Sequence, residues 1–83
     1  MTKIAYAVSF IDGNTVKGVA SKIFIKDAST ILTIGHDHAP LVGTLDTGEI
    51  SIFPVDDGDV KTHAFKEAFL NCHDNTCTVT ILG

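Results

Sequence analysis

The chain of 83 residues has no arginine and no long apolar run, and it has only two cysteines. All six basic residues are lysines, scattered from Lys3 to Lys66, and the formal net charge is −4. Nucleic-acid-binding domains usually carry a basic stripe and favour arginine for bidentate phosphate and guanine contacts, so we set this class aside. The scattered lysines also form no polybasic anchor for anionic lipid.

No apolar run approaches the roughly 20 residues that a membrane-spanning helix needs. The start Met1-Thr2-Lys3, followed by alternating residues, is not the pattern of a signal peptide. Two cysteines without an export signal indicate a reducing compartment, so we expect Cys72 and Cys77 to be buried free thiols. A zinc site built on this pair would need a second pair of ligands, and none has suitable spacing.

Residues that favour strands are abundant, since Val, Ile and Thr account for 26 of the 83 residues. Side chains branched at Cβ lose rotamer freedom in a helix but pack well on a pleated surface. A chain of this length forms one domain, here 1–83, with a thin core. Turn signals recur about every 8–12 residues, as in sandwiches and barrels. We therefore expect an all-β fold, a flattened two-sheet β-sandwich or barrel of about eight to ten short strands.

Alternating side chains locate the individual strands. In the first strand four apolar residues share one face: Ile4, Tyr6, Val8 and Phe10. Gly18, inside the extended run 16–26, predicts a bulge or sharp bend through which one long strand could serve two sheets. Between 62 and 73 the apolar residues recur instead at helical spacing, which leaves a short helix and a strand equally open: Phe65, Ala68, Phe69 and Cys72.

Two histidines form the motif that most resembles a chemical site. On extended chain His36 and His38 point the same way, so both could reach one metal ion. The glutamate that follows such a pair in small metal-binding barrels is missing here. A cupin-like metal-binding protein that uses His36 and His38, with His63 or His73 as a further ligand, stays open as the alternative function.

Nothing else in the sequence predicts catalysis or a cofactor. The acidic turn at 56–59 lacks the glycine and glutamate positions of a helix-flanked calcium loop. The serines have no nucleophile-elbow context, and no glycine-rich loop opens a helix to hold phosphate. We expect a non-catalytic protein without a cofactor.

A distinctive stretch runs from 31 to 50: a short apolar strand, a loop ending in His38-Ala39-Pro40-Leu41, a strand, a turn closing in Gly48, and another strand. This order of elements resembles the ε subunit of F-type ATP synthase. Gly18 with the alternating run after it, and the closing segments 68–71 and 79–82, extend the resemblance over nearly the whole chain.

The chain also departs from that family. Lys66-Glu67-Ala68 replaces the usual small residues, Thr47 replaces a proline, and Ile31 stands where an acidic residue is common. Family members continue into a helical hairpin that regulates ATP hydrolysis, whereas this sequence stops at Gly83. The resemblance implies the coupling role without that arm, in either a naturally short or a truncated form.

The resemblance implies a rotor-stalk subunit of a proton- or sodium-translocating rotary ATP synthase, which clamps the foot of the γ subunit and rests on the c-ring. The complex would hold it at the cytoplasmic face of a bacterial plasma membrane, or at the matrix or stromal side in an organelle. A free-standing adaptor for another partner is the third possibility. The resemblance assigns Phe10 and His38 to the face toward γ, and Ser29, Thr30 and Ile31 to the side toward the ring. The positions assigned to core and turns are Gly18, Ala39, Pro40, Leu41 and Gly48.

Overall fold

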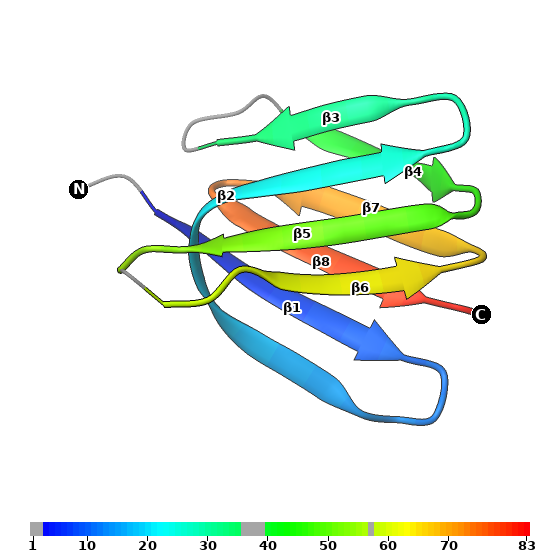
Figure 1. Ribbon diagram of the computed structural model, residues 1–83, viewed down its shortest axis with the longest axis horizontal. Helices are drawn as coiled ribbons and strands as arrows, with labels where there is room; N and C mark the ends of the chain where they lie inside the picture. The colour runs from blue at the N-terminus through cyan, green and yellow to red at the C-terminus, as the bar shows by residue number, and fades with distance from the viewer. Residues whose placement is uncertain (1–2, 36–39, 57) are drawn as a thin grey trace.

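The computed structural model describes residues 3–35, 40–56 and 58–83, and in these ranges the chain forms eight strands and no helix (Figure 1). The strands are β1 (Ile4–Phe10), β2 (Thr15–Asp27), β3 (Ile31–Ile34), β4 (Leu41–Leu45), β5 (Gly48–Pro54), β6 (Lys61–Phe65), β7 (Ala68–His73) and β8 (Thr76–Ile81). The expected all-β fold is confirmed. Over the same ranges no helix is found that could cross a membrane.

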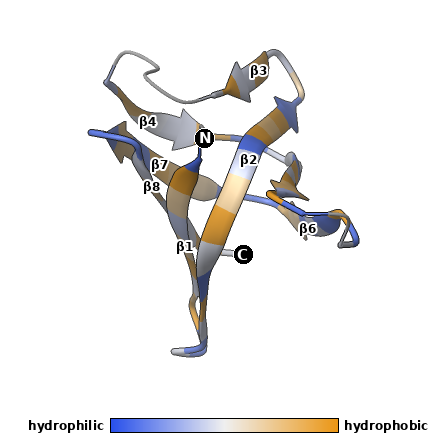
Figure 2. Ribbon diagram, turned by 90° about the vertical axis from the view of Figure 1, so that its left-hand side faces the viewer, coloured by the Kyte–Doolittle hydropathy of each residue, from blue (hydrophilic) through white to orange (hydrophobic). Residues whose placement is uncertain are grey.

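All eight strands belong to one hydrogen-bonded sheet, which folds over on itself at β2. The strand order is β4-β7-β8-β1-β2-β5-β6, with β3 also paired to β2. β2 is 13 residues long and pairs with β1 through its first half and with β3 and β5 through its second. The two halves therefore lie in different layers, and Figure 2 shows these layers edge-on. The first layer holds β4, β7, β8, β1 and the start of β2, and the second holds the rest.

The bend in β2 lies slightly beyond the glycine that was expected to make it. The register with β5 shifts between Ala20 and Lys22, and such an irregularity increases local twist. Gly18 has another role, because it lies directly opposite Tyr6 and the Tyr6 ring packs across it. A Cβ atom on Gly18 would lie 2.7 Å from the Tyr6 hydroxyl oxygen. Gly18 thus makes room for an aromatic ring that covers the edge of the core.

The core lies between the two layers and consists of aliphatic side chains from alternate strand positions. The largest fully buried side chains are Ile4, Val8, Ile23, Ile25, Ile34, Ile50, Leu70, Cys77 and Val79. No charged or polar residue is buried among the described residues. Burial of an aliphatic side chain contributes about 1.5–3 kcal/mol, so these side chains hold the two layers together.

The segment with helical spacing consists of two strands, so the helix alternative for 62–73 is wrong. β6 ends at Phe65 and β7 begins at Ala68, and both residues are buried. Two residues, 66 and 67, form the corner between the strands. The buried residues on either side of it are therefore three positions apart, which is also the spacing of one helical turn. In a helix the four apolar residues would share one buried face, but Phe69 is 41% exposed on the outer face of β7.

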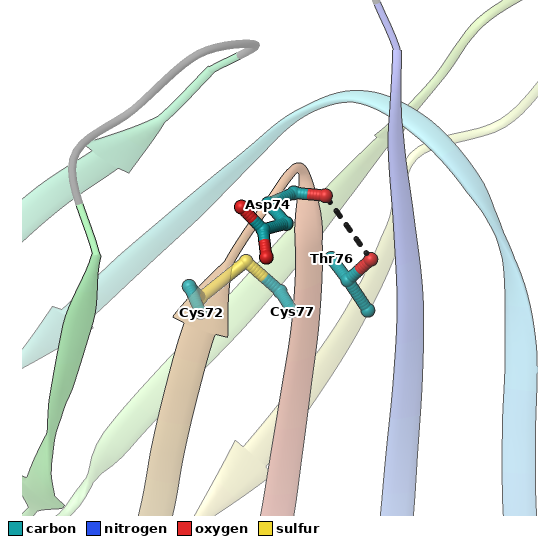
Figure 3. The surroundings of a disulfide bond; sticks show 4 residues. All are labelled: Cys72, Asp74, Thr76 and Cys77. Atoms are coloured by element: carbon teal, nitrogen blue, oxygen red, sulfur yellow. Dashed lines mark hydrogen bonds between the residues drawn. A yellow bond between two sulfur atoms is a disulfide. The ribbon is translucent and has the colours of Figure 1, made fainter.

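β7 and β8 form a tight hairpin closed by a disulfide bond. Asp74 and Asn75 both have positive φ angles, 49° and 60°, as a two-residue type I′ turn requires. The turn places Cys72 directly opposite Cys77, with their Cα atoms 4.1 Å apart, and the two sulfur atoms are bonded (Figure 3). The expectation of free thiols is therefore wrong. The two-residue turn pairs these two positions across the hairpin, which brings the two thiols within bonding distance of each other.

Candidate protein-interaction site

Phe10 is the last residue of β1, at the end of the strand away from the bend in β2. Its ring is partly buried, packs against the core and makes an edge-to-face contact with His63 of β6, with ring centroids 5.4 Å apart. The contact joins the first layer to the second. The His63 Nε2 atom is buried and has no hydrogen-bond partner in the structure. His63 was expected only as a further metal ligand, but its pairing with the buried Ile50 places it on the inner side of β6.

An open cleft of about 450 Å³ lies between the first half of β2 and the β5–β6 region. Tyr6 and Ile52 line its apolar part. Five charged residues surround it: Lys3, Lys17, Lys61, Asp56 and Asp59. Half of the six lysines of the chain thus gather around one cleft, although the sequence shows them as scattered.

The outer face of the first layer carries almost no charge. Among its described strand positions Lys17 is the only lysine or acid and His73 the only histidine. The rest are small, hydroxyl-bearing, amide or apolar residues: Ala5, Ala7, Ser9, Thr15, Val19, Val42, Thr44, Phe69, Asn71, Thr76, Thr78 and Thr80. Val42 is 64% exposed and Val19 is 46% exposed. Depletion of charge is what distinguishes the buried centre of a protein interface from the rest of a surface.

The loop after β2 is organised by the carboxylate of Asp27. Its Oδ1 atom accepts hydrogen bonds from the backbone N–H groups of Ser29 at 2.9 Å and Thr30 at 2.7 Å. Its Oδ2 atom accepts one from the N–H of Asp46, in the loop before β5, at 3.2 Å. Asp27 therefore ties the two loops at this end of the sandwich together. The hydrogen bond from Ser29 is the main cause that lowers the pKa of the Asp27 carboxyl group.

Asp27→Ala should lower the thermal midpoint at neutral pH, because three backbone N–H groups lose their acceptor. The pKa is lower in the folded state, so the charged carboxylate stabilises the fold above the unfolded-state pKa. That stabilisation is lost as the pH falls through the folded-state pKa. The difference in thermal midpoint between wild type and Asp27→Ala, measured from pH 7 to pH 3, should therefore become smaller as the pH falls.

Asp12→Ala is the matched control for Asp27. Asp12 accepts a backbone hydrogen bond only from Asn14, within its own turn, and ties no second loop to it. Its removal should change the midpoint less than the Asp27 variant does. Equal effects of the two substitutions at pH 7 would contradict the role assigned to Asp27.

The residues assigned to the ring-facing side lie at the same end of the sandwich, together with Gly48. Ile31 begins β3 and is 66% exposed, next to the Asp27 loop that contains Ser29 and Thr30. Gly48 begins β5 and packs directly against the backbone of Lys26 and Asp27. Ser29 and Ile31 are exposed at this end, and Thr30 between them is partly buried.

The histidine loop cannot be placed, because His36, His38 and Ala39 lie outside the described residues. Pro40 is exposed, and Leu41, at the start of β4, is partly buried against the core. His73 lies at the end of β7, with its Nδ1 atom 3.6 Å from a carboxylate oxygen of Asp74. In the part of the chain that the structure describes, no group of three potential ligands could hold a metal. The metal-site alternative at His36 and His38 stays a prediction.

The chain matches known proteins in its fold and not in its sequence. No family model matches the chain, and no curated protein matches it. Among solved structures, the fold matches a chain in the cryo-EM structure of the central stalk and c-ring of the Tetrahymena thermophila mitochondrial ATP synthase, with a TM-score of 0.78. The match covers 96% of this chain and 63% of that chain, at 15% sequence identity. This protein therefore shares its fold with a domain-sized part of a component of that rotary complex.

Proposed function

We propose that this protein is an ε-type rotor-stalk subunit of a rotary ATP synthase, without an active site of its own. It would couple rotation of the c-ring to the γ subunit and the catalytic head. The observation that carries the proposal is the match over 96% of the chain to a solved chain of an ATP synthase central stalk and c-ring. The sequence motif His38-Ala39-Pro40-Leu41, with the strands around it, supports the same assignment independently of the fold.

The arrangement of surfaces suits a part that is covered in an assembly. The outer face of the first layer is nearly free of charge, which favours contact with another protein over contact with water. Phe10, at the end of β1, would face γ, as would His38. The Asp27 loop, with Ser29, Thr30 and exposed Ile31, would approach the polar loops of the c-ring. The complex would hold the protein at the membrane without a direct lipid anchor.

Binding to a purified γ subunit from the same organism tests the proposal. Aromatic anchors at interface centres cost about 2 kcal/mol or more when truncated, so Phe10→Ala should weaken γ binding by at least about tenfold. Titration calorimetry of wild type and variant measures this ratio. The thermal midpoint of Phe10→Ala must also be recorded, because Phe10 packs partly against the core.

Phe53→Ala is the matched control, since it removes a partly exposed phenylalanine from β5, in the second layer. Phe53 alternates with the buried Ile50 and Ile52 and packs beneath Lys22, so its ring lies outside the core and does not take part in the Phe10–His63 contact. It should change γ binding less than Phe10→Ala does. Failure of the wild-type protein to bind γ at micromolar concentrations would count against the rotor-stalk function itself. Equal effects of the two substitutions would count only against Phe10 as the anchor.

A further inference from the structure

The cleft beside β2 is bordered by a stretch of strand edge that no other strand covers within the described residues. β1 pairs with β2 from Thr15 to Ala20, whereas β5 pairs with β2 only from Ala20 onward. Between Thr15 and Val19 the second side of β2 thus has no strand partner. An uncovered edge presents a row of backbone N–H and C=O groups that can pair with another chain.

The direction of these groups follows from the turn between β1 and β2. The N–H of Phe10 donates to the carbonyl oxygen of Asn14 at 2.8 Å, so this opposed pair is hydrogen-bonded. In an antiparallel ladder hydrogen-bonded and non-hydrogen-bonded pairs alternate, so Val16 and Gly18 also direct their backbone groups toward β1. Thr15 and Lys17 then direct theirs away from β1, to the uncovered side. Lys17 is also among the residues that line the cleft.

The side chains around the cleft indicate which segment would fit. Lys3, Lys17 and Lys61 line it, in a chain whose formal net charge is −4. Asp56 and Asp59, on the β5–β6 loop, also contribute to the lining. Exposed apolar surface is present beside the lysines, since Val19 and Val55 are 46% and 38% exposed and also line the cleft. An extended segment with alternating acidic and apolar side chains complements this combination.

We propose that the cleft binds an extended acidic segment of a partner protein, which adds to β2 as an extra strand along Thr15–Lys17. Main-chain hydrogen bonds to Thr15 and Lys17 hold the segment, and the lysines select its charge. The backbone edge favours a peptide over a small anion, because a small anion would use only the exposed ammonium groups. The inference goes beyond the proposed function, because it describes a mode of binding that does not require the partner to be γ.

A synthetic octapeptide of alternating glutamate and valine, capped at both ends, is a suitable probe, with the lysine–valine octapeptide as its charge control. Titration followed by amide chemical shifts should show binding of the acidic peptide, with the largest shifts at 15–19. The basic peptide should not shift these amides. Added salt should weaken binding, because the charges around the cleft are exposed to solvent.

Lys17→Pro tests the backbone part of the proposal. Proline removes the N–H that points away from β1 and leaves the bonds of β1 intact, as on edge strands generally. Lys17→Gln removes the charge alone. One lost hydrogen bond should make the proline variant bind the acidic peptide about fivefold more weakly than the glutamine variant. Lys26→Gln, which removes a lysine outside the cleft lining, should leave binding unchanged.

Three results would overturn the proposal: equal binding of the acidic and basic peptides, equal affinity of Lys17→Pro and Lys17→Gln, or shifts located away from 15–19. The amide chemical shifts of β1 in peptide-free Lys17→Pro should match those of the wild type, which shows that this variant folds. Thr15→Pro is a second edge variant, and an unaltered thermal midpoint shows that it folds as well. Peptide binding without γ binding would leave this inference standing and count against the rotor-stalk function. The reverse result would overturn the inference alone.

Discussion

Gly48→Ala should lower the free energy of unfolding by about 3 kcal/mol, the upper end of the usual cost of overpacking. A Cβ atom at Gly48 would overlap the carbonyl oxygen of Lys26 and lie 2.6 Å from the Cα atom of Asp27. Both obstacles are backbone atoms of β2, so no side-chain rotation can relieve the clash. In a domain of this size the thermal midpoint should fall by more than about 10 °C.

Gly43→Ala is the control for this prediction. Gly43 also lies at a strand position, in β4, but a Cβ atom there would meet nothing within 4 Å. Alanine restricts the unfolded chain more than glycine does, so Gly43→Ala should be neutral or stabilising by up to about 1 kcal/mol. Urea unfolding of the two variants measures the difference. Equal free energies of unfolding for the Gly48 and Gly43 variants would contradict the close contact between Gly48 and the β2 backbone.

Opening the Cys72–Cys77 disulfide should lower the free energy of unfolding by about 2 kcal/mol. The bond closes a short loop, so the constraint that it places on the unfolded chain is near the lower end of the usual range. Both cysteines are almost completely buried, at 4% and 1% exposure, so reduction requires the end of the hairpin to open first. Thermal unfolding with and without a phosphine reductant measures the loss.

The double variant Cys72→Ala/Cys77→Ala serves as the control, because its thermal midpoint should not respond to the reductant. Alkylation followed by mass measurement reports the state of the two sulfur atoms directly. The unreduced, unfolded wild-type protein should take up no alkyl group, and the reduced protein should take up two. Rapid labelling of both cysteines without reductant would contradict the bonded pair.

Much of the strand pattern could be predicted because one face of each strand is buried. Ile4, Tyr6 and Val8 alternate with exposed or half-exposed residues, and all three are in the core. Between 62 and 73 the sequence left helix and strand equally open, because the corner at 66–67 interrupts the alternation between Phe65 and Ala68. A period of three or four arises there from two strands and a corner, and the sequence contains no local signal that separates this case from a helix.

The contacts of the candidate interaction site could be predicted from the sequence less well than the strands could. The motif around His38 led to the rotor-stalk hypothesis, but the motif itself does not show that Phe10 contacts His63, 53 positions further along the chain. The carboxylate of Asp27 likewise ties two loops together through Ser29, Thr30 and Asp46, which are up to 19 positions away. Contacts of this kind depend on strand order, which local patterns do not contain.

The sequence by itself determined the all-β character of the protein, because branched side chains and a period of two are local properties that each segment carries alone. Only the tertiary structure decided that three separated lysines surround one cleft, and that β2 keeps an edge between Thr15 and Val19 that no described strand covers. The reason is physical: register and layer packing are set by contacts between residues far apart in the chain, and their energies become available only once the strands have paired.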